Sequence, residues 1–132
     1  MPIDEMNNIA LEVLTFFKTM VFESLGNEKL TGNCGFACQF ASSLIPKFYG
    51  FQVAIRGGDG LNDGGYIDPE GNKHGHYWLE VYTPDQAYIF DITVSQFGQD
   101  LPMVLPLEGN KHYINGCQNR VDEHMKELMS GI

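Results

Sequence analysis

The sequence predicts an α+β protein in which N-terminal helices precede an antiparallel β-sheet. Apolar residues recur at helical spacing early in the chain, and they alternate with polar residues further on. Turn-forming residues separate the alternating runs, as expected for strands joined by hairpins. Helices grouped before strands are typical of the α+β class. At 132 residues the chain has the length of one domain, so we expect a single domain over 1–132.

The first predicted helix covers residues 4–25. Its apolar positions fall at steps of three and four and therefore form one stripe. They are Met6, Ile9, Ala10, Val13, Leu14, Phe17, Met20, Val21 and Leu25. Asp4 is the expected N-cap, and Gly26 and Asn27 are the expected stop.

A second helix is expected to begin at Cys34, with Asn33 as its N-cap, and to run to about Ile45. Pro46 and Gly50 predict its end. Its expected apolar face consists of Cys34, Ala37, Cys38, Ala41, Leu44, Ile45 and Phe48.

The remaining pattern predicts strands and one further helix. Strands are expected at 51–56, 76–83 and 88–93, and a short C-terminal helix around 122–129. A turn at Pro84 and Asp85 would make the last two strands a hairpin. The glycine-rich segment 57–75 has no periodicity, which predicts a long loop with a functional role or high mobility.

The formal net charge is −9, from 17 acidic and 8 basic residues. A nucleic-acid-binding surface needs clustered basic residues to displace phosphate counterions, so this class of partner is not expected. The acidic balance is compatible with a protein partner or substrate that has a basic surface.

The N-terminus is acidic and polar, unlike a secretory signal peptide. The longest mostly apolar stretch, 9–22, is interrupted by Glu12, Thr15 and Lys18, so no membrane span is expected. Three cysteines without a signal peptide predict free thiols in a reducing compartment. We therefore expect a cytoplasmic protein, with export by a route that leaves no such signature as the alternative.

Cys34 is the candidate nucleophile. The unpaired N–H groups and the dipole at a helix N-terminus favour a thiolate, and Gly35 leaves room for a substrate backbone. Cys38 lies one turn further on and is expected to be a packing residue. The same packing role is the alternative for Cys34.

His76 and Asp91 complete the predicted group. His76 begins a strand whose alternation puts it on one face with Trp78, while Asp91 is expected in the middle of the next strand. A carboxylate flanked by apolar residues needs a partner, since an unpaired buried charge is costly. The hairpin makes His76 the simplest cross-strand partner. Thiol acyl transfer needs this combination of thiolate, imidazole and orienting acceptor.

Three phrases of the chain resemble a known superfamily. G-N-C-G-F-A around Cys34, G-H-Y-W-L-E-V-Y around His76 and I-F-D-I-T around Asp91 resemble the motifs of the transglutaminase-like/papain-like cysteine enzymes. The resemblance covers residues 32–98, about half of the chain. It implies a papain/transglutaminase-like fold with N-terminal helices packed on an antiparallel β-sheet, and a Cys-His-Asp triad.

The compact spacing also resembles the glutamine-deamidating domains of certain bacterial toxins and effectors. In those domains a glutamine shortly after the Asp supplies part of the oxyanion hole, and Gln96 stands at that place. In papain the oxyanion glutamine precedes the Cys, whereas the amides nearest before Cys34 are Asn27 and Asn33. This departure favours the toxin-like resemblance. A surface amide is the alternative for Gln96.

The resemblance implies a thiol hydrolase or acyl transferase that acts on a protein or peptide substrate without a cofactor or metal. Glutamine deamidation, peptide cleavage and transglutaminase chemistry remain open. A non-catalytic binding or inhibitory module on the same scaffold is the alternative from another class.

Two metal sites are weaker alternatives. Cys34, Cys38, His74 and His76 offer four zinc ligands, although cysteines four apart on a helix differ from the usual tight C-x-x-C turn. Separately, a calcium loop is suggested by the oxygen-bearing residues and glycine at Asp59, Asp63, Gly64 and Glu70. Leu61 offers no side-chain oxygen where that loop needs one, and a strand precedes the loop where a helix is required.

Overall fold

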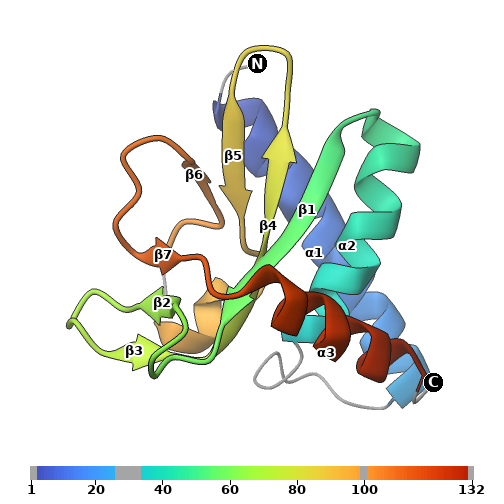
Figure 1. Ribbon diagram of the computed structural model, residues 1–132. Coiled ribbons are helices and arrows are strands. Elements are labelled where there is room, and N and C mark those ends of the chain that lie inside the picture. Colours follow the sequence, from blue (N-terminus) through green and yellow to red (C-terminus); the bar gives the residue numbers. More distant parts are fainter. Residues whose placement is uncertain (1–2, 26–33, 99–100, 131–132) are drawn as a thin grey trace.

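The structure is a computed structural model that describes residues 3–25, 34–98 and 101–130 (Figure 1). The helices are α1 (Ile3–Leu25), α2 (Cys34–Tyr49), α3 (Gln118–Ser130) and the short 3₁₀ helix η1 (Val94–Phe97). The strands are β1 (Gln52–Gly58), β2 (Gly65–Ile67), β3 (Lys73–His74), β4 (His76–Tyr82), β5 (Ala87–Phe90), β6 (Val104–Pro106) and β7 (Tyr113–Ile114).

The strands form two antiparallel sheets, one with the order β1-β4-β5-β6 and one with the order β3-β2-β7. In Figure 1 α1 lies behind the larger sheet and α2 lies beside β1, while the smaller sheet lies near the end of β4 where that strand begins. The predicted α+β class, with N-terminal helices and antiparallel sheet, is confirmed. The predicted hairpin is also confirmed: β4 pairs with β5, and Thr83 N–H donates to Gln86 O at 3.0 Å.

The main core lies between the helices and the larger sheet. On α1, the residues Met6, Ala10, Val13 and Phe17 are fully buried at the spacing that the sequence predicts. They pack in one cluster with Ala37 and Ala41 of α2 and Leu79 and Val81 of β4. The hydrophobic effect of burying these side chains holds both helices on the sheet.

A second, aromatic core covers the other face of β4. Trp78 is fully buried there among Tyr66, Ile89, Val94 and Tyr113. The side chains of β4 therefore separate as alternation predicts, with Leu79 in one core and Trp78 in the other. His76 shares the Trp78 face, which explains how a polar side chain at the beginning of a strand is only 1% exposed.

Several predicted helix boundaries are corrected. Asp4 lies in the first turn of α1, and Pro46 lies inside α2, which continues to Tyr49. Pro46 has no N–H donor, but its carbonyl still accepts a hydrogen bond from Gly50 N–H at 3.1 Å. Met20 and Phe48, which were expected on the apolar faces, are exposed. The predicted caps and stops at Gly26, Asn27 and Asn33 fall outside the described residues.

The predicted structureless loop at 57–75 is also corrected. Its ends belong to β1 and β3, and β2 lies in its middle. Backbone hydrogen bonds fix it, including Gly60 N–H to Gly64 O at 3.0 Å. Tight contacts between glycine backbones replace the side-chain periodicity that normally indicates strands. The short strands β6 and β7 were missed, and α3 begins earlier than predicted.

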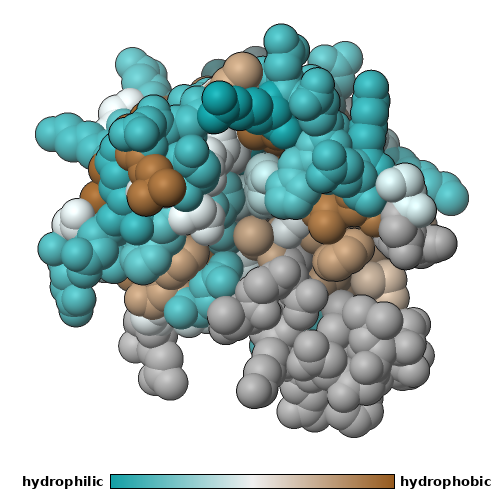
Figure 2. All heavy atoms as spheres, turned by 60° about the horizontal axis from the view of Figure 1, so that its bottom comes forward, coloured by the Kyte–Doolittle hydropathy of each residue, from teal (hydrophilic) through white to brown (hydrophobic). Residues whose placement is uncertain are grey.

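None of the helices within the described residues has the length and hydrophobicity of a membrane-spanning segment. Figure 2 is turned so that the bottom of Figure 1 comes forward: among the coloured residues, hydrophilic side chains predominate, with smaller hydrophobic patches between them.

Gly64 and Gly71 give a matched test of the close packing in this segment. Both have positive φ, +73° and +88°. A Cβ at Gly64 would collide with the Ile114 carbonyl and lie 2.7 Å from Gly116 N, whereas nothing lies within 4 Å of a Cβ at Gly71. We expect Gly71→Ala to cost about 1–2 kcal/mol of backbone strain. Gly64→Ala should cost a further ~1–3 kcal/mol, as overpacking does. Urea unfolding measures both, and equal losses would contradict the expectation.

Candidate active site

Cys34 is the first residue of α2 and is partly exposed. Its backbone N–H is among the first four of the helix, which have no partner within the helix. Cys34 is among the groups that raise the pKa of His76, after Asp91, so its side chain lies within interaction range of the imidazole. The structure therefore brings the two residues together, although they come from a helix and a strand far apart in the sequence.

His76 is the first residue of β4, and its side chain is 0% exposed. Its Nε2 lies 2.7 Å from Asp91 Oδ2. The edge of its ring contacts Phe97, with the ring centroids 4.8 Å apart, and it also meets Tyr66 at 6.0 Å. Aromatic rings thus limit how far the imidazole can rotate, while Asp91 holds one of its nitrogens.

Asp91 follows β5 instead of lying within a strand, which corrects the sequence prediction. The register of the hairpin ends at Leu79 opposite Phe90, so Asp91 would face Trp78 if the strand continued. The chain turns here instead, and Val94 N–H reaches back to Asp91 O at 3.4 Å. This turn allows the carboxylate to meet His76 diagonally.

Asp91 is 2% exposed, yet its carboxylate has several hydrogen-bond donors. Besides His76, the Tyr113 hydroxyl donates to Oδ2 at 2.8 Å. Thr93 donates to Oδ1 through its N–H and its hydroxyl, both at 3.3 Å. A buried carboxylate is tolerated only when its oxygens are satisfied in this way.

Gln96 lies on η1, on the Nδ1 side of the imidazole. Its Nε2 is 3.4 Å from His76 Nδ1 and 3.4 Å from Thr93 Oγ1. Both contacts are long, so the amide is only loosely held by the protein. All four predicted site residues, Cys34, His76, Asp91 and Gln96, therefore lie within one chain of contacts.

The protonated form of His76 is favoured. Burial of the ring by itself lowers the pKa, but the charge and hydrogen bond of Asp91, together with Cys34, outweigh it and raise the pKa of His76 to about 9. His76 is accordingly an imidazolium at neutral pH, hydrogen-bonded to Asp91 through Nε2.

Several residues around His76 and Asp91 are not predicted by the sequence. Thr93 belongs to the I-F-D-I-T phrase, and the only local signal for its role is that the residue two positions after an Asp often hydrogen-bonds to it in a turn. Tyr113 comes from a segment with no periodic pattern, and nothing in its sequence neighbourhood links it to Asp91. Tyr66 lies in the segment that was predicted as a loop.

The other cysteines and the other candidate metal ligand, His74, have surroundings that differ from those of Cys34 and His76. Cys38 is 6% exposed, and burial raises the pKa of its thiol well above the usual value, as a packing role predicts. Cys117 is exposed at the start of α3. His74 Nε2 lies 2.8 Å from Asp68 Oδ2. Within the described ranges, no group of three or more His, Cys, Asp or Glu side chains is placed to hold a metal ion.

Asp59 and Asp63 of the suggested calcium loop accept hydrogen bonds from backbone groups. Asp59 Oδ1 accepts from Leu61 N–H at 2.7 Å and from Asp63 N–H at 3.1 Å. Asp63 Oδ1 accepts from Cys117 N–H at 2.8 Å, which ties the segment to the start of α3. These oxygens therefore stabilise turns.

Comparisons of the chain with protein-family models, curated proteins and solved structures found no match.

The pKa of His76 predicts how stability depends on pH. The pKa of folded His76, about 9, lies above the ordinary histidine value of 6.5, so protonated His76 stabilises the folded state. This contribution is fully present below about pH 6.5 and is lost as the pH rises through about 9. We expect the free energy of unfolding to decline between these limits, and His76→Gln to flatten the decline.

The exposed His112 supplies the control. His112→Gln should keep the wild-type slope in the same urea titrations at a series of pH values. An unchanged slope in His76→Gln would show that His76 does not bind its proton more tightly in the folded state.

Proposed function

We propose that this chain is a cysteine-nucleophile hydrolase or acyl transferase that acts on amide carbonyls of proteins, on a papain/transglutaminase-like fold. The observation that carries the proposal is the fully buried His76, which has Asp91 2.7 Å from Nε2 and Cys34 as its other partner at a helix N-terminus. A thiol, an imidazole and an orienting carboxylate in this order are the components of thiol acyl transfer.

The raised pKa of His76 indicates how the reaction would begin. In the proposed reaction Cys34 attacks as a thiolate, the nucleophilic form of a thiol, while His76 carries the proton that the leaving group will need. The sulfur attacks the amide carbon and forms a tetrahedral intermediate. His76 then gives its proton to the departing nitrogen, and the C–N bond breaks to leave a thioester and ammonia or an amine.

The second half of the reaction returns the enzyme to its starting state. Neutral His76 takes a proton from water, and the hydroxide attacks the thioester carbon. The C–S bond breaks, which releases a carboxylic acid and restores the thiolate and imidazolium. If an amine replaces water, the product is an amide and the enzyme is a transglutaminase. Asp91 holds Nε2 of the imidazole, which leaves Nδ1 as the nitrogen that exchanges the proton in this proposal.

We assign two donors to the negative oxygen of the tetrahedral intermediate. One is the backbone N–H of Cys34, which has no partner within α2 because of its position at the helix start. The other is the Nε2 of Gln96, which lies on the Nδ1 side of His76 and has only long contacts within the protein. Donors aimed at a developing charge stabilise the transition state more than the ground state.

Glutamine side chains of proteins are the substrate that we favour, with peptide cleavage next. This choice rests on the resemblance of the Asp91-to-Gln96 spacing to glutamine-deamidating toxin and effector domains. The net charge of −9 favours a target with a basic surface around the glutamine. No cofactor is required for this chemistry.

Thiol reactivity tests the nucleophile. We expect iodoacetamide to modify Cys34 below neutral pH much faster than Cys38 or Cys117, because only Cys34 lies beside an imidazolium. Replacing His76 by Ala should slow the reaction of Cys34 at low pH and leave the exposed Cys117 unchanged. Peptide mapping by mass spectrometry reports each site. A Cys34 that reacts only above about pH 8, like an ordinary thiol, would instead favour a binding module without turnover.

Gln96→Ala tests the oxyanion donor. Loss of the Gln96 amide should lower turnover by roughly 10²–10³ with little change in substrate binding, because its hydrogen bond to the substrate oxygen strengthens only in the transition state. Gln96→Glu should be at least as damaging, since a carboxylate repels the developing charge. Combining Cys34→Ala with Gln96→Ala should add almost nothing to Cys34→Ala alone. The exposed Gln86, in the β4–β5 turn, is the matched control, and Gln86→Ala should retain wild-type turnover.

Intact-mass measurement of basic candidate proteins identifies the reaction. Deamidation leaves the chain uncut and heavier by the difference between an amide and a carboxylic acid. Fragments would establish proteolysis by the same residues. Full activity in Gln96→Ala would remove Gln96 from the mechanism.

A further inference from the structure

Asp91 Oδ2 is shared between two donors. His76 Nε2 lies 2.7 Å from it, and the Tyr113 hydroxyl donates to it at 2.8 Å. The contacts of the other oxygen, both with Thr93, are longer at 3.3 Å. The two shortest hydrogen bonds of the carboxylate therefore converge on the atom that holds the imidazole.

This sharing has a chemical consequence for His76. A carboxylate oxygen that accepts a second hydrogen bond has part of its negative charge neutralised, so it attracts the imidazolium less strongly. The second bond also fixes the plane of the carboxylate, and with it the orientation of the ring. Removing the tyrosine hydroxyl should accordingly make His76 hold its proton more tightly and orient it less well.

Tyr113 is held in place by the smaller sheet. It lies on β7, opposite Tyr66 of β2, and the two rings pack with centroids 4.8 Å apart. Asn110 fixes the turn before it: its Oδ1 accepts from Tyr113 N–H at 2.9 Å, and its Nδ2 donates to Tyr113 O at 2.7 Å. Trp78 meets the ring edge-on at 5.1 Å.

The Tyr113 hydroxyl remains a donor at every pH at which the protein would work. Burial, and then the charge of Asp91, raise its pKa well above the ordinary value. Tyr113 is only 4% exposed, so it does not face a bound substrate.

We propose that Tyr113 is a positioning residue of the Cys34-His76-Asp91 group, which orients Asp91 and limits how strongly Asp91 binds the His76 proton. The role rests on the proposed function, since it matters when His76 must give its proton to a leaving group. It assigns the smaller sheet β3-β2-β7 a part in the chemistry, because this sheet carries the tyrosine.

The test is Tyr113→Phe, which removes the hydroxyl and keeps the ring. NMR titration of the imidazole should show the pKa of His76 raised by roughly 0.5–1, the order expected for one lost hydrogen bond to its partner. The alkaline limb of kcat/KM should move upward by the same amount, because that limb reports His76. We expect kcat to fall about tenfold while KM changes little, since an acid that holds its proton more tightly is a poorer donor.

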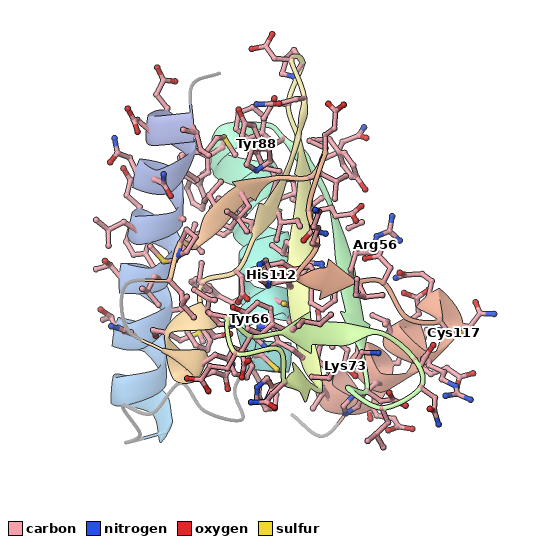
Figure 3. All side chains as sticks on the ribbon, turned by 90° about the vertical axis from the view of Figure 1, so that its left-hand side faces the viewer. Arg56, Tyr66, Lys73, Tyr88, His112 and Cys117 are labelled. Carbon is pink, nitrogen blue, oxygen red and sulfur yellow. The ribbon has the colours of Figure 1, made fainter. Side chains whose placement is uncertain are left out.

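Tyr88→Phe is the matched control. Tyr88 is a fully buried tyrosine whose hydroxyl accepts from Gln86 Nε2 at 2.7 Å. Figure 3 shows it at the opposite end of the larger sheet from Tyr66 and His112 of the β2–β7 region. Loss of the Tyr88 hydroxyl should lower the free energy of unfolding without changing the pKa of His76. If Tyr113→Phe likewise lowers stability but leaves the pKa of His76 unchanged, Tyr113 has a structural role only and the proposal is wrong.

A measurement on the unmodified chain covers the case in which Tyr113→Phe does not fold. The Tyr113 hydroxyl proton should be protected from exchange, and its chemical shift should change as His76 titrates near pH 9. A hydroxyl resonance that ignores this titration, or that exchanges too fast to observe, would overturn the proposal.

The imidazole titration needs no turnover, so the two proposals can fail separately. A shifted pKa of His76 in a chain that modifies no protein substrate would support the link between Tyr113 and Asp91 and reject the proposed reaction. Normal turnover with an unshifted pKa would reject the role of Tyr113 alone.

Discussion

The structure depends on one buried ion pair, His76 with Asp91. Both side chains are almost fully removed from solvent, at 0% and 1% exposure. Charges in such a place are strongly destabilising unless they are paired and hydrogen-bonded. Around this pair the chain turns after β5, the threonine of that turn donates twice, and the smaller sheet contributes a tyrosine hydroxyl. The donors come from different elements of the fold, yet all of them hydrogen-bond to the carboxylate of Asp91.

The two hydrophobic cores hold the pair from opposite sides of one strand. The helices pack on the face that carries Leu79 and Val81, which brings the N-terminus of α2 to the beginning of β4. The aromatic core packs on the face that carries Trp78 and encloses the imidazole. The helix core therefore places the thiol, and the aromatic core places the histidine and its partner. Water excluded by the aromatic rings would otherwise weaken the attraction between the two charges.

The same enclosure sets the protonation of the site. A buried imidazole without Asp91 would lose its proton more readily than one in water, because burial disfavours the charged form. The carboxylate reverses this and raises the pKa of His76 to about 9. The hydrogen bonds from Tyr113 and Thr93 satisfy the carboxylate that produces this shift.

The sequence by itself determined the class of fold and the two N-terminal helices, and it singled out Cys34, His76, Asp91 and Gln96 as candidates, because periodicity, helix starts and hairpin turns are local signals. It failed where contacts between distant backbones replace side-chain patterns, as in the glycine-rich segment and the short strands β6 and β7. Only the tertiary structure decided that Asp91 follows its strand and that Tyr113 reaches it. The physical reason is that a buried carboxylate collects donors from wherever the fold brings them, and sequence distance does not encode that proximity.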